Sequence, residues 1–525
     1  MRLMTRLIYL AFRKAHKAFL RDTRDPKAAT ERLWEDIWDE VGGSKHWLEN
    51  KPCASPELAD FPLSVYNDYK DTIAESYRTG ESLLARSKII YWGQSSGTTT
   101  KIPKVYPVTA RYRKQMEAVG QAHTYTFLTE FPDYFFGKAL FFVANRLEQT
   151  EDDKYERAYM SNYGIRQMPK FLFNYSSVLP RSIYMTTEDD FHEWGGLYAV
   201  AGEIEYTTMI LPGIFHGFWS RILSEVESYW PYLEGKKSLP EHLPPLKCSA
   251  SRLKHLREVF SRDEFTMKDV WPTLHTVFSW RSGISQFQED ALRKVLGNVP
   301  VYNLPYCATE GYFCVPLKGD SLGGAVHPGA NILEFLPVEK EPVSSNLVSV
   351  WDLEEGEKYE LVITTTMGMI RYRMFDIVKC TGFFNASPII EFVCKAAHVA
   401  RLNQSNVYET NLAEAIRRSD FSLDRKWVFG PNDQGNQLCL YVRRPEGIGP
   451  EWDDSAEVKQ LFNAAIGVDR VLSELNDSYG EERRLKLLFE PQVKSLPHDH
   501  VVWTKDDMLT TKPRLLLSVA PHLAT

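Results

Sequence analysis

Apolar and polar positions follow different periods in different parts of this 525-residue chain. The first ninety residues have the spacing of amphipathic helices, interrupted by a Pro-rich stretch. Residues 87–92 and 105–108 are short apolar runs on either side of a Ser/Thr/Gly-rich segment, which predicts a strand, a loop and a strand. Helical spacing returns at residues 110–129, and residues 190–300 mix helices with short strands.

From residue 330 to residue 392 the pattern becomes that of β-structure. Short runs of β-branched and aromatic residues, separated by turn signals, predict strands at 331–336, 359–365, 370–373 and 377–381. Beyond residue 395 the alternation starts afresh, with helices predicted at 409–418 and 456–475 and strands at 426–429, 437–443 and 485–489. We therefore predict an α/β protein with a large N-terminal domain, residues 1–395, and a small α+β C-terminal domain, residues 396–525, joined by a hinge at 393–403.

Composition and charge limit the classes of partner. Aromatic residues make up 13% of the chain, enough for a large core and an apolar pocket. The net charge of −7 argues against general nucleic-acid binding, which needs a broad basic surface, so an anionic ligand must be held by a local site. The seven cysteines are scattered, without a Cys-x-x-Cys pair, which predicts reduced thiols in a cytoplasmic protein and no structural zinc site.

The N-terminal 21 residues carry six Lys or Arg and no acidic residue. Their apolar stretch, residues 7–12, is too short for a signal peptide. We predict an amphipathic helix packed on the body of the protein, with attachment to a membrane surface as the alternative. No apolar run approaches the roughly 20 residues that span a bilayer, so we expect no transmembrane segment.

The first candidate for chemistry is the polar segment between the two predicted strands. It contains Ser95, Ser96, Gly97, Thr98 and Thr99, with Lys104 close behind. Hydroxyl and backbone N–H donors in such a loop can surround phosphate oxygens, while the lysine adds positive charge. By itself the segment is equally compatible with an ordinary polar turn, and it lacks the spacing of a Walker-type loop.

Two further segments add carboxylates. Tyr306 begins the sequence Tyr-Cys-Ala-Thr-Glu-Gly, in which the hydroxyl of Thr309 stands beside the carboxylate of Glu310. This pair suits a phosphate contact and a Mg²⁺ ligand, because Mg²⁺ takes one or two carboxylates together with substrate phosphates. The third segment ends at Asp376, which can accept both hydroxyls of a ribose. Each segment alone also occurs for structural reasons.

Together, in this order and spacing, the segments resemble one family: the acyl acid amido synthetases first known from auxin-responsive plant genes (the Gretchen Hagen type). This family belongs to the adenylate-forming superfamily, with acyl-CoA ligases and firefly luciferase. Residues 95–104 are similar to its first nucleotide motif, and residues 306–311 to its Tyr-x-Ser/Thr-Ser/Thr-Glu-Gly motif. The longest match, residues 350–392, includes Gly356, Tyr359, Glu360, Leu361, Gly368, Asp376, Thr381, Gly382, Phe383 and Asn385.

The resemblance implies a luciferase-like fold, in which a large domain of β-sheets flanked by helices is closed by a small mobile domain. It also implies ATP, Mg²⁺, a small carboxylic acid, an acyl-adenylate intermediate and an amine acceptor, in most relatives an amino acid. The nucleotide contacts carried over are Ser95, Ser96, Gly97, Thr98, Thr99, Lys104, Tyr306, Thr309, Asp376 and Lys395. Glu310 would bind Mg²⁺, Thr309 would touch the α-phosphate, and Lys512 of the small domain, or alternatively Lys505, would reach the same phosphate.

The sequence departs from the family pattern at several positions. Thr100 and Lys101 stand where relatives usually have Gly, and Lys395 where an Arg is usual. Phe375 replaces a Gly, and its bulky side chain is expected to resist a positive φ. Two alternatives stay open beside amide formation: a thiol acceptor, such as coenzyme A or a carrier protein, and an inactive homologue that only binds ligand, which Thr100, Lys101 and Phe375 support.

Overall fold

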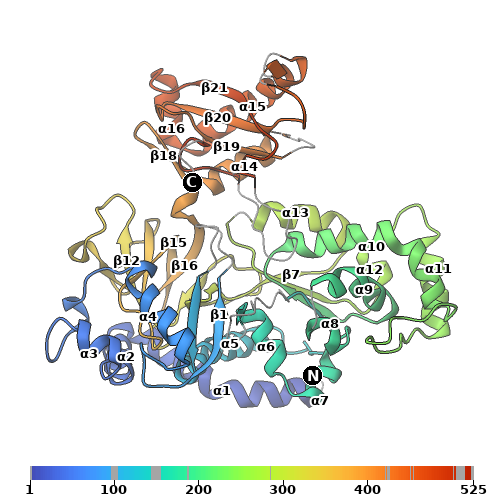
Figure 1. The fold of residues 1–525 in the computed structure, drawn as a ribbon, viewed down its shortest axis with the longest axis horizontal. Helices are drawn as coiled ribbons and strands as arrows, with labels where there is room; N and C mark the ends of the chain where they lie inside the picture. Colours follow the sequence, from blue (N-terminus) through green and yellow to red (C-terminus); the bar gives the residue numbers. More distant parts are fainter. Residues whose placement is uncertain are drawn as a thin grey trace.

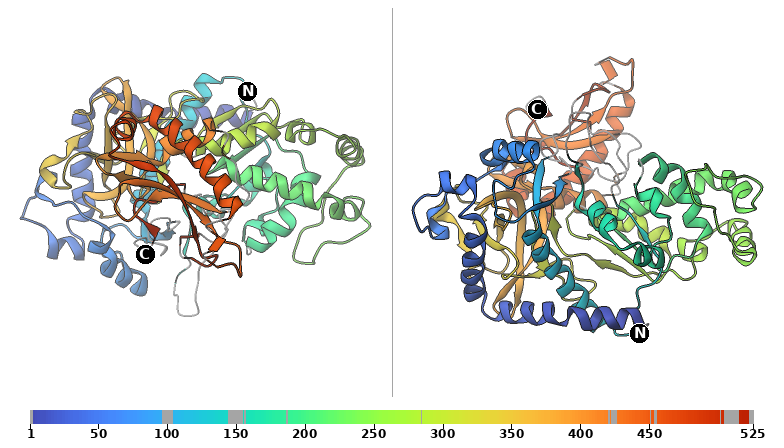
Figure 2. Two further views of the ribbon diagram at one scale, coloured as in Figure 1. Left: turned by 90° about the horizontal axis from the view of Figure 1, so that it is seen from above. Right: turned by 60° about the horizontal axis from the view of Figure 1, so that its bottom comes forward.

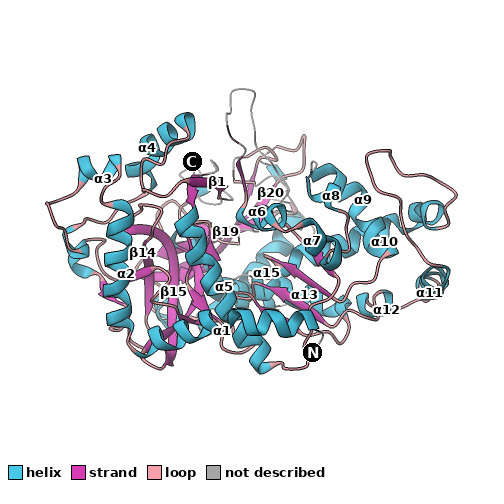
Figure 3. Ribbon diagram, turned by 90° about the horizontal axis from the view of Figure 1, so that it is seen from below, coloured by secondary structure: helices cyan, strands magenta, loops and turns pink. Residues whose placement is uncertain are grey.

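The computed structural model describes residues 3–95, 104–143, 155, 157–185, 188–283, 285–419, 421, 426–449, 451–452, 455–500, 502–503 and 515–521. The protein has the predicted α/β fold, with a large region (residues 3–395) of sheets flanked by helices and a small region (residues 396–521). The small region, orange and red in Figure 1, lies above the large one in that view. Figure 3 shows strands β14 and β15 on one side of the large region and helices α9 to α12 on the other.

The chain begins with helices, as predicted: α1 (Leu3–Arg24), α2 (Pro26–Val41), α3 (Lys45–Asn50) and α4 (Tyr66–Thr79). Helix α1 runs along the outside of the large region (Figure 2) and packs on α5 (Ala110–Glu130), where the rings of Tyr9 and Tyr125 stack with centroids 4.2 Å apart. Asp25 caps α2 by accepting from the N–H of Ala28, and Pro26 occupies its first turn. The predicted amphipathic helix packed on the protein body is thus confirmed.

The predicted β-rich segment forms a seven-stranded sheet with the order β10-β11-β16-β15-β14-β12-β13. Its strands are β10 (Cys314–Val315), β11 (Gly324–Val326), β12 (Ile332–Pro337), β13 (Val348–Ser349), β14 (Lys358–Thr364), β15 (Tyr372–Phe384) and β16 (Ser387–Lys395). The two strands predicted at 370–373 and 377–381 are one continuous strand, β15, because pairing with β14 and β16 carries the backbone through the residues between them. That part of the prediction was wrong.

A second sheet is parallel, with the order β3-β5-β6-β7. Its strands are β3 (Ala139–Phe141), β5 (Tyr206–Met209), β6 (Thr276–Ser279) and β7 (Val301–Asn303). The helices between and beside them are α6 (Met160–Gln167), α7 (Lys170–Ser176), α8 (Arg181–Met185), α9 (Glu188–Ala201), α10 (Pro212–Leu233), α11 (Ala250–Phe260), α12 (Met267–Val270) and α13 (Ser285–Leu296). Apolar side chains of strands and helices bury one another in a single large cluster, as parallel sheets require.

The predicted strand, loop and strand near residue 100 is confirmed at both ends. β1 (Ile89–Gln94) pairs antiparallel with β2 (Val105–Thr109) and parallel with β4 (Arg157–Ala158). The short hairpin β8 (Cys307–Ala308) and β9 (Gly311–Tyr312) follows the parallel sheet. Apolar side chains of these small elements pack in the same cluster as those of β12, β14 and β15 of the seven-stranded sheet.

The small region consists of the hairpin β17 (Val399–Leu402) and β18 (Ser405–Tyr408), the sheet β19 (Trp427–Pro431), β20 (Gln437–Arg443) and β21 (Phe489–Leu496), and helices α14 (Glu409–Arg418), α15 (Ala456–Leu475) and α16 (Asp477–Arg484). Residues between Ala400 and Leu516 form an apolar cluster of their own. The prediction of a strand at 485–489 was wrong. After α16 the backbone turns at Lys486, whose φ is 59°, and the side chains of Leu485 and Leu487 are more than half exposed. β21 begins only at Phe489.

None of the helices in the described ranges combines the length and the apolar character needed to cross a bilayer.

All seven cysteines are free thiols, four of them buried.

Arg371 ties the N-terminal segment to the seven-stranded sheet. Its guanidinium, almost fully buried, forms a bidentate pair with Glu334 at 3.0 and 2.7 Å. Its remaining nitrogen donates to the carbonyls of Ala59 and Phe61 at 3.1 and 2.9 Å. A planar guanidinium can satisfy a carboxylate and two carbonyls at once, which a lysine could not.

Arg371→Met is expected to destabilise the large region by about 3 kcal/mol or more, because it leaves the buried carboxylate of Glu334 without its partner. The measurement is urea unfolding followed by circular dichroism. The double variant Arg371→Met/Glu334→Leu is expected to recover part of the loss, since it removes the orphaned charge as well. A double variant that is less stable than the single one would contradict this account.

Candidate functional site

Those predicted site residues that the structure describes gather beyond the carboxyl ends of β6 and β7, where ligands commonly bind in open parallel sheets. Trp280 follows β6 and Tyr306 follows β7, and their rings stack with centroids 6.2 Å apart. Phe392 of β16 packs against both rings, at 4.8 and 5.5 Å. An aromatic wall therefore joins the parallel sheet to the seven-stranded sheet at the place where the polar residues converge.

Asp376 of β15 is the first carboxylate of the site, and it is 2% exposed. Its Oδ2 accepts a hydrogen bond of 2.6 Å from the hydroxyl of Tyr306. Its Oδ1 forms an ion pair with Nζ of Lys395, which lies directly opposite on β16. Each oxygen keeps a second lone pair that can accept from a ligand hydroxyl. The structure thus brings together three predicted contacts, Tyr306, Asp376 and Lys395.

Glu310, the second carboxylate, lies in the tight turn between β8 and β9 and is 9% exposed. Its Oε1 accepts a hydrogen bond of 2.5 Å from Tyr106 of β2. The hydroxyl of Tyr106 lies 3.1 Å from that of Tyr372, which in turn accepts from Nζ of Lys104 at 3.2 Å. A chain of hydrogen bonds therefore connects Glu310 with Lys104 through two tyrosines.

Thr309 is held against β1. Its Oγ1 donates to the carbonyl of Gln94 at 3.3 Å, and its own carbonyl accepts from the hydroxyl of Tyr112 at 2.9 Å. A Cβ on Gly93 would stand 3.1 Å from Cγ2 of Thr309, so glycine permits the close approach of strand and turn. The amide of Gln94 is buried without a hydrogen-bond partner in the described part of the chain, which leaves an unpaired polar group beside Thr309.

The predicted phosphate loop starts and ends beside these residues. The N–H of Ser95 donates to the carbonyl of Lys104 at 2.9 Å, and the N–H of Lys104 donates to Oγ of Ser95 at 3.0 Å. Nζ of Lys104 lies 5.4 Å from the ring centre of Tyr66. Ser96, Gly97, Thr98 and Thr99, with the departures Thr100 and Lys101, lie outside the described residues, as do both lysine candidates of the small region, Lys505 and Lys512.

The charges of the site shift the pKa values of its members. Burial would lower the pKa of Lys395, but the negative charges of Asp376 and Glu310 outweigh it, and the pKa is raised. Burial lowers the pKa of Lys104. The negative charges of Glu310 and Asp376 act to raise it and the positive charge of Lys395 acts to lower it, and the net result is a lowered pKa. Burial, followed by the adjacent carboxylate, raises the pKa of Tyr106 and of Tyr306 well above the usual value. Both tyrosines therefore stay protonated as donors.

The residues present fit a magnesium ion that is completed by ligand phosphates. Within the described ranges no three His, Cys, Asp or Glu side chains converge as a closed metal cage. Glu310 offers Oε2, for which the described residues provide no hydrogen bond, while Oε1 is fixed by Tyr106. Mg²⁺ needs only one or two carboxylate ligands from a protein when phosphates and water supply its other ligands, and Glu310 offers one such carboxylate.

Phe375 does adopt the positive φ that its bulk was expected to resist. Its φ is 54°, and its ring lies 4.5 Å from the guanidinium of Arg373. Arg373 itself is held by a bidentate pair with Glu360 at 2.8 and 2.9 Å. The packing of the ring on a fixed guanidinium offsets the local strain, so Asp376 follows Phe375 in β15 with its side chain in the site.

Sequence reasoning missed the roles of Tyr106, Tyr112 and Gln94. Tyr106 stands in an apolar run that predicted only a strand, 204 residues from Glu310 along the chain. The one available signal was its hydroxyl at a fully buried strand position, since a buried tyrosine hydroxyl usually finds a partner. Nothing in the sequence indicates which partner that is.

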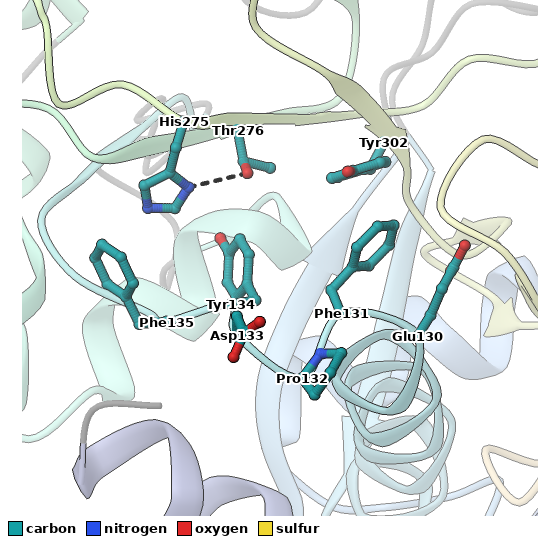
Figure 4. A pocket seen from close by; sticks show the side chains of 9 residues that line it. All are labelled: Glu130, Phe131, Pro132, Asp133, Tyr134, Phe135, His275, Thr276 and Tyr302. Atoms are coloured by element: carbon teal, nitrogen blue, oxygen red, sulfur yellow. Dashed lines mark hydrogen bonds between the residues drawn. The ribbon is translucent and has the colours of Figure 1, made fainter.

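A separate cavity of about 400 Å³ lies at the amino ends of β6 and β7, the opposite edge of the parallel sheet. Figure 4 shows it between His275, Thr276 and Tyr302 on one side and the segment from Glu130 to Phe135 on the other. None of the predicted site residues lines it. The cavity is therefore not part of the polar site.

Comparisons with known proteins agree on one family. The model of the GH3 family N-terminal domain matches residues 16–301, and that of the GH3 family central domain matches residues 324–395. The chain is similar to indole-3-acetic acid-amido synthetase GH3.15 of Arabidopsis thaliana, with 24% identity over 69% of this chain and 66% of that protein. It is also similar to indole-3-acetic acid-amido synthetase GH3.4 of the same plant, with 22% identity over 77% of this chain and 73% of the relative.

Among solved structures, the acyl acid amido synthetase AtGH3.15 in complex with 2,4-DB has the same fold, with a TM-score of 0.73 at 17% identity. The superposition covers 92% of this chain and 89% of that one.

Replacing Asp376 with Asn is expected to lower the pKa of Lys395, because burial then acts on the ammonium with one carboxylate fewer to oppose it. Only the neutral amine reacts with acetic anhydride, so labelling of Lys395, followed by mass spectrometry, should set in at lower pH in the variant. Lys236, whose side chain is 74% exposed, is the internal control. An unchanged or upward-shifted onset would contradict the ion pair.

Proposed function

The chain belongs to the GH3 family, and from this membership we propose that it adenylates a carboxylic acid with ATP and transfers the acyl group to the amine of an amino acid, releasing AMP and pyrophosphate. The observation that carries the proposal is the convergence of Glu310, Thr309 and Asp376, from distant parts of the chain, on one polar site. The names of the two Arabidopsis relatives support the amide product.

The reaction has two halves because a carboxylate is a poor electrophile. In the first, a carboxylate oxygen attacks the α-phosphorus of ATP, the bond between that phosphorus and the oxygen bridging to the β-phosphorus breaks, and pyrophosphate leaves. In the second, the neutral amine attacks the acyl carbon, the bond from that carbon to the phosphate oxygen breaks, and AMP leaves. The amine nitrogen gives up its extra proton to solvent.

The nucleotide is held from both sheets. Asp376 accepts the ribose hydroxyls with its remaining lone pairs, while Tyr306 and Lys395 fix the carboxylate in place. The hydroxyls and backbone N–H groups of Ser95, Ser96, Gly97, Thr98 and Thr99 surround the phosphates, with Nζ of Lys104 adding charge at the edge of the loop. The direct pairing of Ser95 with Lys104 supports this arrangement, because it closes the loop at the mouth of the site.

Thr309 and Glu310 act at the reacting phosphate. Mg²⁺, when bound, neutralises charge on the phosphates. Glu310 would hold the metal with its carboxylate, which Tyr106 keeps from turning away. Thr309, whose carbonyl accepts from Tyr112, would exchange the hydrogen bond from its hydroxyl to the carbonyl of Gln94 for one to the α-phosphate.

The small domain, residues 396–525, serves as the lid of the large domain, residues 1–395. Lys512 reaches the α-phosphate from this lid and neutralises the charge that grows there, with Lys505 as the other candidate. Rotation at the hinge, residues 393–403, then admits the amine. The separate apolar cluster of the small region supports a unit that can move as one body.

The free thiols support action in the reducing cytoplasm on small molecules. Phe375 was one of three reasons to consider an inactive homologue, with Thr100 and Lys101, and the accommodated ring removes that one reason.

Glu310→Ala is expected to lower acid-dependent ATP–pyrophosphate exchange on the order of 100-fold or more, since it removes the metal ligand at the reacting phosphate. The wild-type chain is first screened with aryl and alkyl acids to find an active one. Glu258→Ala, on the exposed face of α11, is the matched control and should leave exchange unchanged. Undiminished exchange in Glu310→Ala would remove this residue from the mechanism.

The second half-reaction should produce an amide at a rate that rises with pH until the acceptor amine is fully neutral. Synthetic acyl-adenylate is offered with a mixture of free amino acids or with coenzyme A, and products are identified by mass spectrometry. An amide, and no thioester, is the expected result. Exclusive formation of a thioester would instead assign the chain to the thiol-acceptor ligases.

A further inference from the structure

Helix α1 has an inner face that packs on the protein. The rings of Tyr9 and His16 stack on Tyr125 of α5, with centroids 4.2 and 4.5 Å apart. Further along the helix, the fully buried ring of Phe19 packs on Phe384 of β15 at 5.8 Å. These contacts fix the helix on the large region, and its opposite face is left for solvent or for a partner.

The outer face of α1 carries two exposed leucines among cations. Leu7 and Leu10, one turn apart, are 53% and 57% exposed. The exposed cationic residues of the helix are Arg6, Arg13, Lys14, Lys17, Arg21 and Arg24. At 3.6 residues per turn, these eight side chains start from about one third of the helix circumference. The one carboxylate of α1, Asp22, is buried. The outer face is therefore positive on a chain whose net charge is −7.

This face lies on an open edge of the molecule. Figure 2 shows α1 along the outside of the large region, and its 22 residues form a ridge about 33 Å long. Figures 1 and 3 show α7 on the same lower side of the molecule. Helix α7 exposes Phe171 and Tyr175, by 73% and 44%, together with Lys170. A second element that is both apolar and basic thus stands on this side.

The combination of charge and apolar surface selects one class of partner. Cations alone would suit any polyanion, including a nucleic acid. Exposed Leu and Phe side chains gain only where a partner takes up apolar groups, and a nucleic-acid backbone does not. A bilayer with anionic headgroups offers both, because a basic amphipathic helix lies in the plane of the interface with its apolar side chains at the boundary of the acyl chains. Each Lys or Arg near such a surface strengthens binding about 5-fold.

We propose that the outer face of α1, together with Phe171 of α7, binds the surface of a bilayer that contains anionic lipid. Leu7, Leu10 and Phe171 enter the headgroup region, and the Lys and Arg side chains of the helix contact lipid phosphates. The inner face stays packed on the protein, because different side chains make the two sets of contacts. The inference does not depend on the proposed function, since no residue of the nucleotide site takes part.

The test measures binding of the full chain to vesicles by co-sedimentation. Vesicles of phosphatidylcholine are compared with vesicles that also contain about 30% phosphatidylglycerol, at about 0.1 M salt. The anionic vesicles should bind the chain at least about 10-fold more strongly, and about 1 M salt should abolish the difference because it screens the charges. Equal binding to both kinds of vesicle, or no binding to the anionic ones, would overturn the proposal.

Reversal of two charges locates the electrostatic part. Lys14→Glu/Lys17→Glu should weaken binding to the anionic vesicles about 25-fold or more, since two attractive charges become repulsive. Lys236→Glu/Lys237→Glu, in the exposed turn after α10, is the matched control because it changes the net charge by the same amount. It should weaken binding less than about 3-fold. Equal losses in the two variants would show that net charge alone decides, which contradicts the proposal.

The apolar part is tested with the charges kept. Leu7→Ser/Leu10→Ser should weaken binding about 10-fold, and Phe171→Ser about 3-fold. Phe489→Ser, at a position of the small region that is 58% exposed, is the control and should leave binding unchanged. Circular dichroism verifies folding, and Phe171→Ser decides alone if the double variant does not fold. Undiminished binding in the folded variants, with displacement of the vesicles by a short single-stranded RNA, would assign the face to nucleic acid instead.

Acetylation of lysines shows which face meets the bilayer. In the presence of the anionic vesicles, labelling of Lys14 and Lys17 by acetic anhydride should slow at least about 3-fold, because the headgroups cover them. Lys236, 74% exposed, is the internal reference and should keep its rate. Protection of Lys236 without protection of Lys14 and Lys17 would place the bilayer on another face and overturn the proposal.

Discussion

The two buried carboxylates of Glu310 and Asp376 are the constraint on which the centre of the molecule depends. An unpaired buried charge would cost several kcal/mol, so each must be met by donors or cations. The partners are Tyr106 of β2, Tyr306 in the loop after β7, and Lys395 of β16. The sheets therefore have to meet at this point for the carboxylates to be tolerated, and the meeting point is the site.

The same arrangement explains how the site is prepared before a ligand arrives. The carboxylates of Glu310 and Asp376 and the ammonium groups of Lys104 and Lys395 balance one another in charge. Tyr106 and Tyr306 stay protonated because burial raises their pKa. Groups that are already oriented need not reorganise when charge develops on a phosphate. Phe375 fits the same pattern, because its positive φ is supported by the guanidinium that Glu360 holds in place.

The small region also contains a buried carboxylate whose donors are fixed, but this one does not face the nucleotide site. It is Glu409, the first residue of α14, and its donors are Nδ1 of His398 and the backbone N–H groups of Leu515 and Leu516. Where Glu310 and Asp376 orient atoms toward a ligand, Glu409 orients one segment of chain toward another.

The sequence alone determined the local structure: the helices 110–129 and 409–418 and the strands on both sides of the Ser/Thr/Gly segment follow from short-range periodicity. The candidate residues Thr309, Glu310 and Asp376 came from the resemblance of three segments, in their order and spacing, to one family. The sequence could not show that Tyr372–Phe384 is one strand or that β21 begins after residue 488, since partner strands decide where pairing continues. Nor could it assign Tyr106 to Glu310 or His398 to Glu409. Those contacts join groups whose separation along the chain carries no information about their distance in space, and only the packing of the sheets brings them together.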